Sequence, residues 1–229
     1  MSRKNSNTYL SSLLLTSCLA FSFGNAYAYE QGDWLIHGRI INVNPDSDSS
    51  TISLPSGSVP DSGVTVDDAW TIDISFTRMF TKNIAVNLLL DLSSQHDVIA
   101  TGATLGGLGK IVDARVLPPA LLVQYHFNPD AKAQPYVGAG INFTLFFDES
   151  ATASLEGALG PSDVDLDESF GVALQAGVDI DMRNGWFWNV DVKYIDLDTT
   201  ATITSPGGIS TVDVDINPFV LGIGFGKRF

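Results

Sequence analysis

Hydrophobic and polar residues alternate with a period of two along much of this chain. From Trp70 to Thr77, every even position is apolar and every odd position is polar. Such alternation is typical of a β-strand with one apolar and one polar face. The pattern predicts eight strands, which cover residues 34–44, 70–77, 84–92, 117–127, 137–147, 170–180, 186–194 and 219–229.

The lengths of the strands and of their connections indicate the environment of the sheet. Most of the strands have about 10 to 13 residues, whereas a soluble strand averages about 5–6 and a tilted membrane-crossing strand needs about 9–11. Short connections (81–83, 128–134, 182–185) alternate with longer ones (45–67, 93–115, 148–168, 199–211). An open sheet edge is not tolerated in lipid, so the sheet must close. The sequence therefore predicts an all-β fold, an eight-stranded antiparallel transmembrane β-barrel with short periplasmic turns and longer extracellular loops.

A soluble lipocalin-like barrel is the alternative architecture. It would have the same number of strands, with the apolar face turned inward. Gly32-Asp33-Trp34 matches the Gly-x-Trp start of that family. However, the polar face consists mostly of Gly, Asn, Thr and Asp, with few of the Lys and Glu residues that a water-exposed surface carries. The pattern favours the membrane barrel.

The N-terminal segment has the layout of a secretory signal peptide. Arg3 and Lys4 precede an apolar stretch from Leu10 to Phe23, and Ala26-Tyr27-Ala28 is an Ala-x-Ala cleavage signal. We expect residues 1–28 to be removed and residues 29–229 to form the barrel. The alternative is lipidation at Cys18, because the residues before it fit a lipobox. The apolar stretch continues beyond Cys18, which argues against that alternative.

Composition narrows the classes of partner. The 229 residues include 12 Lys and Arg against 26 Asp and Glu, a formal net charge of −14, and one cysteine. Nucleic acid is excluded as a partner because phosphate binding needs clustered Lys and Arg. A single cysteine cannot form an internal disulfide framework. No apolar run after the signal reaches 18 residues, so the sequence predicts no transmembrane helix.

Catalytic and metal sites find little support in the sequence. Small barrel enzymes use His together with Ser or Asp near the extracellular rim. His96-Asp97 lies near that rim without a visible partner constellation, whereas His37 and His126 fall within strands. We therefore expect no enzymatic activity and no cofactor.

An acidic segment with the spacing Asp163-x-Asp165-x-Asp167 is similar to part of a calcium-binding loop. Glu168 stands where an EF-hand needs Gly, and Leu174 stands where it needs Glu. A solvated acidic loop is the better interpretation, and we expect no metal site. A weak divalent-cation bridge to lipopolysaccharide stays open as the alternative.

Three segments of the chain carry a family resemblance, and they are residues 117–125 (LPPALLVQY), 135–148 (PYVGAGINFTLFFD) and 194–201 (YIDLDTTA). Together they resemble the OmpW family of small outer-membrane proteins. The likeness extends over essentially the whole mature chain. It implies a narrow, partly apolar lumen and a role in moving small hydrophobic molecules across the outer membrane, with release sideways through the wall.

The C-terminus fits the signal that the barrel-assembly machinery reads. Phe225 and Phe229 are the aromatic residues expected to carry it. The resembled family usually ends in aromatic-Arg-Phe, whereas this chain ends in Lys227-Arg228-Phe229. We expect this machinery, outer-membrane lipid and lipopolysaccharide as partners.

The inward-facing positions predict a lumen of mixed character. The residues expected to line it are Leu89, Leu122, Gln124, Asn142, Phe146 and Lys193. Such a lumen could pass an apolar solute, but the same residues could also fill a small barrel completely. Lys193 lies among Asp179, Asp181 and Asp191, either as a charge filter or, as we favour, as part of an internal ion-pair network.

Residues 101–109 are unusually apolar for an extracellular segment. We expect them to fold over the barrel mouth, where solutes would enter; the alternative is a loop that is simply flexible. Taken with the family resemblance, the sequence predicts a passive channel or transporter for small hydrophobic molecules in the outer membrane of a Gram-negative bacterium. The alternative is a non-transporting barrel that serves envelope integrity or acts as an adhesin or receptor.

Overall fold

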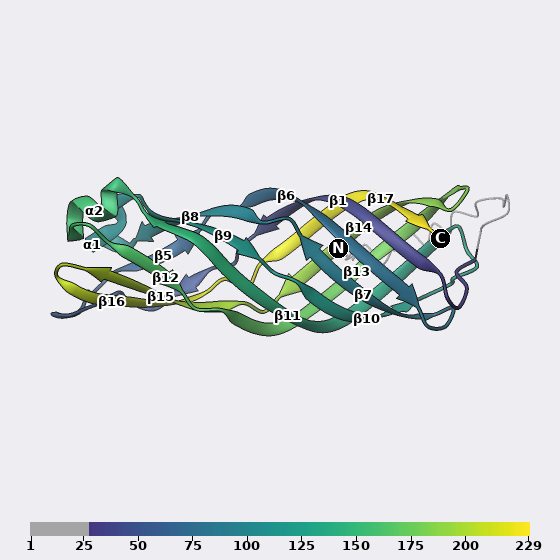
Figure 1. Cartoon of the computed structure of the whole chain (residues 1–229), viewed down its shortest axis with the longest axis horizontal. Coiled ribbons are helices and arrows are strands. Elements are labelled where there is room, and N and C mark those ends of the chain that lie inside the picture. Colours follow the sequence, from purple (N-terminus) through teal and green to yellow (C-terminus); the bar gives the residue numbers. More distant parts are fainter. Residues whose placement is uncertain (1–27) are drawn as a thin grey trace, which may run out of the picture.

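The structure is a computed structural model that describes residues 28–229. Apart from Ala28, the segment expected to be a signal peptide, including Cys18, lies outside the described residues. The described chain forms one elongated body, with both ends of the barrel chain near one end and short helices at the other (Figure 1).

Eight long strands form the barrel. In order around the sheet they are β10 (Ala120–His126), β7 (Ile84–Asp91), β6 (Ala69–Met79), β1 (Trp34–Asn44), β17 (Phe219–Arg228), β14 (Trp186–Ile195), β13 (Ser169–Arg183) and β11 (Ala133–Ala151). All neighbours are antiparallel, and pairing of β10 with β11 closes the sheet. The predicted eight-stranded antiparallel barrel is confirmed.

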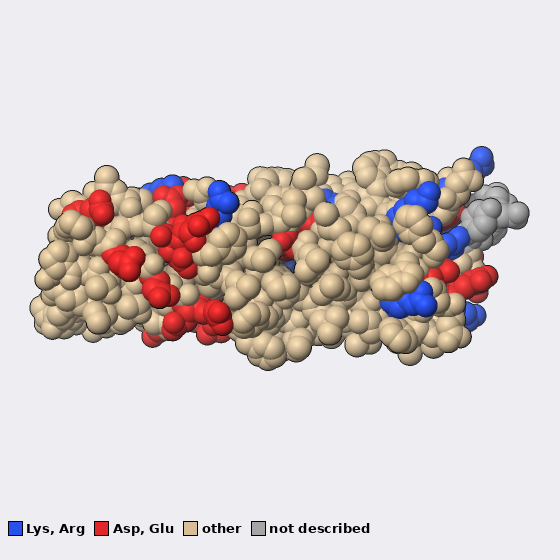
Figure 2. All heavy atoms as spheres, in the orientation of Figure 1, with Lys and Arg blue, Asp and Glu red and all other residues tan. Residues whose placement is uncertain are grey.

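The barrel is apolar outside and polar inside. Outward side chains such as Ile40, Val123 and Leu221 are 58–60% exposed, whereas the inward Arg39 and Asp73 are at most 2% exposed. This is the reverse of a soluble barrel, so the lipocalin-like alternative is wrong. On the face shown in Figure 2, few charged side chains lie between the two ends, and most of the visible Asp and Glu lie in the half that ends in the short helices.

The four long connections are largely ordered into strands that extend the barrel outward. One extension sheet continues β11 with β9 (Lys110–Leu117), β8 (Ser94–Thr101) and β5 (Gly63–Val66). A second sheet contains β12 (Asp163–Leu166), β15 (Asp198–Ser205), β16 (Gly208–Asp215), β2 (Asp48–Ser49), β3 (Ser53–Leu54) and β4 (Gly57–Ser58). The extracellular part is thus a two-sheet extension above the membrane.

The extension has its own apolar core. Ile111, Val112 and Ile203 are at most 5% exposed and belong to one cluster that both sheets share. The short helices α1 (Gly102–Leu105), η1 (Gly106–Leu108) and α2 (Ala153–Leu159) lie at its tip (Figure 1). None of the described helices has the length and apolarity needed to cross a membrane.

Candidate functional site: an apolar cavity above a polar lumen

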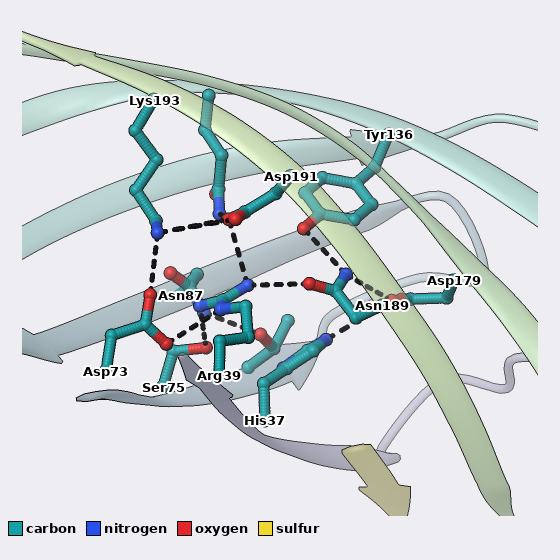
Figure 3. A network of polar contacts seen from close by, with 12 residues as sticks. His37, Arg39, Asp73, Ser75, Asn87, Tyr136, Asp179, Asn189, Asp191 and Lys193 are labelled. Carbon is teal, nitrogen blue, oxygen red and sulfur yellow. Dashed lines mark hydrogen bonds and ion pairs between the residues drawn. The ribbon is translucent and has the colours of Figure 1, made fainter. Parts of the chain in front are cut away.

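A buried arginine organises the polar lumen. Arg39 Nε donates to Asp73 Oδ1 at 2.7 Å, and Nη2 donates to Ser75 Oγ at 2.9 Å. Nη1 donates to Asn189 Oδ1 at 3.1 Å and lies 3.0 Å from Asp191 Oδ2. These partners come from β6 and β14, so one guanidinium joins strands on different sides of the barrel (Figure 3).

Lys193 completes the same network. Its Nζ lies 2.6 Å from Asp73 Oδ2 and 3.3 Å from Asp191 Oδ2 (Figure 3). Of the three acids that the sequence placed around Lys193, only Asp191 is an ion-pair partner. Asp179 lies elsewhere in the lumen, and Asp181 is half-buried near the turn at the end of β13. The paired charges make a structural crosslink, because buried charges need partners.

Hydrogen-bonded amides carry the network across the lumen. Gln175 Nε2 donates to Asp191 Oδ2 at 2.7 Å, and Gln124 Nε2 donates to Gln175 Oε1 at 2.7 Å. His126 Nε2 lies 3.2 Å from Gln124 Oε1. All four side chains are at most 4% exposed.

The periplasmic end of the lumen is filled as well. Tyr29 enters the barrel end, where its hydroxyl donates to Asp179 Oδ2 at 2.7 Å and its ring contacts His126 edge to face. Asn189 Nδ2 donates to Asp179 Oδ1 at 2.7 Å, and His37 Nε2 lies 3.4 Å from the same oxygen (Figure 3). Within the described residues, side chains therefore occupy the lumen from the extracellular mouth to the periplasmic end.

Glycine makes room for this packing. At Gly222 of β17, a Cβ atom would overlap the Asp191 carboxylate and lie 3.3 Å from Arg39 Cδ. The absence of a side chain there lets the network occupy the centre of a narrow barrel.

The apolar residues predicted to line the lumen lie at two different levels. Leu89 and Leu122 are buried at 1% and 2% exposure, together with Ala120 and Ala173, on one side of the barrel. Phe146 is half-buried and packs against the core of the extension. The buried amide of Asn142 accepts a hydrogen bond from the Gly171 backbone N–H at 2.8 Å. The six predicted lumen residues thus point inward without forming one continuous apolar path.

Two adjoining apolar cavities lie above the network. The outer cavity, of about 40 Å³, is enclosed by the extension, and its walls include Phe146, Ile203 and Val212. The inner cavity, also of about 40 Å³, lies at the barrel mouth between the outer cavity and the network, where strands β1, β7, β14 and β17 end. Both cavities are lined by Val66, His96, Val116 and Ile216. These cavities are small, so a large solute can enter them only if the lining side chains move.

His96 is buried at the junction of the two cavities. Its Nδ1 lies 3.0 Å from the Asp67 carbonyl oxygen, which can only accept, so Nδ1 carries the proton. Nε2 then accepts from the Ser94 hydroxyl at 2.8 Å. Burial lowers the pKa of His96 below its ordinary value of about 6.5, against the raising effect of the carboxylates of Asp97 and Asp68. Asp97 forms an ion pair with Lys110, so His96 and Asp97, which are neighbours in the sequence, do not form a catalytic pair.

The barrel wall is interrupted beside the inner cavity. Pairing of β7 with β10 ends at Leu89–Ala120, and pairing of β8 with β9 begins at Ser94–Val116. Pro118 lies in the interval and lines the inner cavity. Proline has no N–H to donate, so it cannot complete a strand ladder.

The remaining predicted features lie on the outer surface. Phe225 is 48% exposed and contacts Trp188 on the lipid face, whereas Phe229 is 66% exposed at the end of the chain. Asp163 and Asp165 are exposed on β12, and among residues 28–229 no cluster of His, Cys, Asp and Glu could hold a metal ion. Residues 101–109 form the tip that contains α1 and η1.

Sequence reasoning missed the cavity walls. His96 falls in a segment that the pattern assigns to a connection, and Val116 and Ile216 lie just outside the predicted strands. The signal was the alternation that continues there, for example Val212, Val214 and Ile216. Short runs of this kind, separated by Gly and Pro, give only a weak strand signal.

Comparison with known proteins agrees with this architecture. The model of the OmpW family matches residues 30–229. Outer membrane protein W of Vibrio cholerae serotype O1 is 35% identical, over 92% of this chain and 94% of its own length. The crystal structure of the outer membrane protein OprG from Pseudomonas aeruginosa has a TM-score of 0.82 and 33% identity, covering 88% of this chain and 98% of OprG.

A more distant relative has a name that refers to metabolism. It is the dibenzothiophene metabolism operon protein PahQ of Pseudomonas aeruginosa, which is 28% identical over 87% of this chain and 90% of its own length. The family model matches nearly the whole described chain, and the barrel is apolar outside and polar inside. The chain therefore belongs to the OmpW family and is a β-barrel of the Gram-negative outer membrane.

Proposed function

We propose that this protein takes up small hydrophobic molecules from the cell exterior and passes them into the outer membrane. The observation that carries the proposal is the pair of apolar cavities in the extension, directly above a barrel mouth closed by buried ion pairs. An apolar solute gains free energy by leaving water for such a cavity. It gains nothing from the polar, filled lumen below.

The exit in this proposal is sideways. The interval between the Leu89–Ala120 and Ser94–Val116 pairs lies beside the inner cavity and at the level where the lipid-facing belt begins. A solute that passes this interval reaches lipid without crossing the ion-pair network. The proposal therefore takes up the sideways release that the family resemblance implies and gives it a path of cavity, wall and membrane.

The extracellular surface supports the direction of uptake. A strongly acidic exterior repels anions but leaves uncharged apolar solutes unaffected. The name of PahQ fits the same class of solute, because dibenzothiophene is an apolar aromatic compound. In this proposal, outer-membrane lipid accepts the solute. Assembly is a separate step, in which the barrel-assembly machinery reads Phe225 and Phe229 when the barrel is inserted.

Transfer into liposomes tests the proposal. Purified protein in liposomes is mixed with a fluorescent polycyclic aromatic compound, and its arrival in lipid is followed by stopped-flow energy transfer. Val116→Trp fills the junction of the cavities and should abolish the protein-dependent acceleration. Val123→Trp is the matched control, since Val123 is 58% exposed on the lipid face and should transfer as the wild type does.

A structural or surface-interaction barrel would give a different result. In that case the wild type and Val116→Trp would transfer the solute at the rate of protein-free liposomes, and truncation of the extension would remove a binding activity instead. That outcome would overturn the uptake proposal.

A further inference from the structure

One oxygen atom of a buried carboxyl group at the barrel mouth has no hydrogen-bond partner among the described residues. Asp91, the last residue of β7, is 3% exposed, and among residues 28–229 its Oδ1 has no hydrogen-bond partner. Buried polar atoms are nearly always hydrogen-bonded, because burial removes their bound water and leaving them unpaired costs free energy. An unpaired carboxylate oxygen inside a cavity therefore indicates a binding partner that comes from outside the chain.

The nearby cations are already engaged. Lys193 and Arg39 both form their ion pairs with Asp73 and Asp191. Asp91 lies opposite Asp73 in the β6–β7 pairing, next to this network, but it takes part in no salt bridge within the described residues. Two cations thus face three carboxylates, and the third one faces the cavity.

The inner cavity combines this carboxylate with an apolar wall. Asp91 and Ser94 line it together with residues such as Val43, Ile195 and Val220. The Ser94 hydroxyl proton is directed to His96 Nε2, so Ser94 has only oxygen lone pairs left to offer. Among the described residues, the polar end of the cavity thus presents Asp91 Oδ1 and the oxygen of Ser94 as hydrogen-bond acceptors.

We propose that Asp91 and Ser94 form the polar end of a binding site for hydrophobic molecules that carry one terminal hydrogen-bond donor. The donor is a hydroxyl or a protonated amine, and the apolar remainder lies between Val66, Val116 and Ile216 toward the outer cavity. This inference rests on the proposed uptake function and names its substrate class. It makes Asp91 a residue that determines specificity.

Three probes of matched length test the site. They are 1-octanol, its isomer 1-methoxyheptane, which has no donor, and protonated octylamine. Binding is measured by calorimetry with the protein in lipid nanodiscs, and the heat of empty nanodiscs is subtracted. Because the buried Asp91 oxygen without a partner gains a full hydrogen bond from the alcohol, 1-octanol should bind about tenfold more tightly than the ether. The relative affinities of octanol and octylamine identify which donor the site prefers.

Asp91→Leu should bring the affinities for octanol and the ether to within about twofold of each other. Asp91→Asn keeps the shape and serves if the leucine variant does not fold; it should weaken octylamine binding relative to the ether. Asp97→Leu is the matched control, because Asp97 lies outside both cavities and pairs with Lys110. It should retain the wild-type preference.

The outcomes separate this inference from the uptake proposal. Equal binding of octanol and the ether by the wild type, or a donor preference that survives in Asp91→Leu, would overturn the role of Asp91 while uptake stands. Binding of none of the three probes would count against the cavity as a binding site altogether.

Discussion

Arg39 of β1 and Asp73 of β6 are direct partners in the sheet, and their side chains meet inside the barrel at 2.7 Å. Neither side chain reaches solvent, and Asp73 also holds Lys193. This pair is the centre of the network that closes the lumen. The proposed path of solutes follows from that closure, because the two apolar cavities lie above it.

Removal of Arg39 should destabilise the barrel strongly. Arg39→Met leaves Asp73 and Asp191 with one cation between them, and breaking a buried ion pair costs about 3–5 kcal/mol. Urea unfolding in lipid vesicles, followed by tryptophan fluorescence, measures the change. Lys82→Met is the control, since Lys82 and Asp130 are exposed and 3.8 Å apart, and it should change the free energy of unfolding by at most about 0.5 kcal/mol. Equal effects of the two variants would show that the network does not support the fold.

Polar solutes should not pass the barrel. The lumen from Asp73 to Tyr29 is filled by buried side chains, so glucose has no path along the axis. Liposome swelling in isotonic glucose should match that of protein-free liposomes, whereas a general porin in the same assay should swell them. Swelling above the protein-free rate would reveal an axial path that the packing excludes.

Pro118 should control the exit from the inner cavity. The Pro119 carbonyl accepts from the Phe143 N–H on β11, so the neighbouring Pro118 presents its backbone to the other side, where the wall is interrupted. Pro118→Ala restores an N–H there. One added hydrogen bond of about 1 kcal/mol should slow transfer to lipid about fivefold.

The matched control for this variant is Pro119→Ala, whose restored N–H points toward β11. It should transfer solute at the wild-type rate. If both variants slowed transfer equally, or neither did, the interval beside Pro118 would not be the exit.

His96 should make the stability of the extension depend on pH. Burial holds its pKa below the ordinary value of about 6.5, so the unfolded chain takes up a proton at a higher pH than the folded protein does. The free energy of unfolding contributed by this residue is therefore constant above pH 6.5 and falls as the pH drops below it. His96→Gln should remove that fall. Titration of the His96 ring proton by NMR measures the pKa directly, and a value above 6.5 would contradict the prediction.

The barrel strands could be predicted from the sequence because lipid imposes a strict pattern. Each position from Ile84 to Asp91 faces either lipid or a narrow lumen, so apolar and polar residues must alternate over the whole strand. The inward placement of Gln124 and Lys193 follows from the same alternation of apolar and polar positions. Register errors are costly, since a shift of one residue would turn these side chains toward lipid.

The two apolar cavities could not be predicted in the same way. Their walls come from many segments distant in sequence, and pairs such as Val66 with Val98 depend on long-range strand contacts. The partners of Lys193 were also only partly predictable. The alternation of apolar and polar positions places several acids in the lumen, but it does not give their height along the barrel. Asp73 lies on another strand and was not among the expected partners.

Photolabelling with a small apolar diazirine, followed by peptide mapping, tests the central claim most directly. The protein in liposomes is irradiated with the probe, and labelled residues are identified by mass spectrometry. Uptake through the extension predicts labels on cavity residues such as Val66, Val116 and Ile216, which lie away from the lipid-facing belt, and none on Gln124, Tyr136 or Asn189 in the lumen. Labels on those lumen residues, with the cavity residues unlabelled, would contradict the account and indicate an axial path through the barrel.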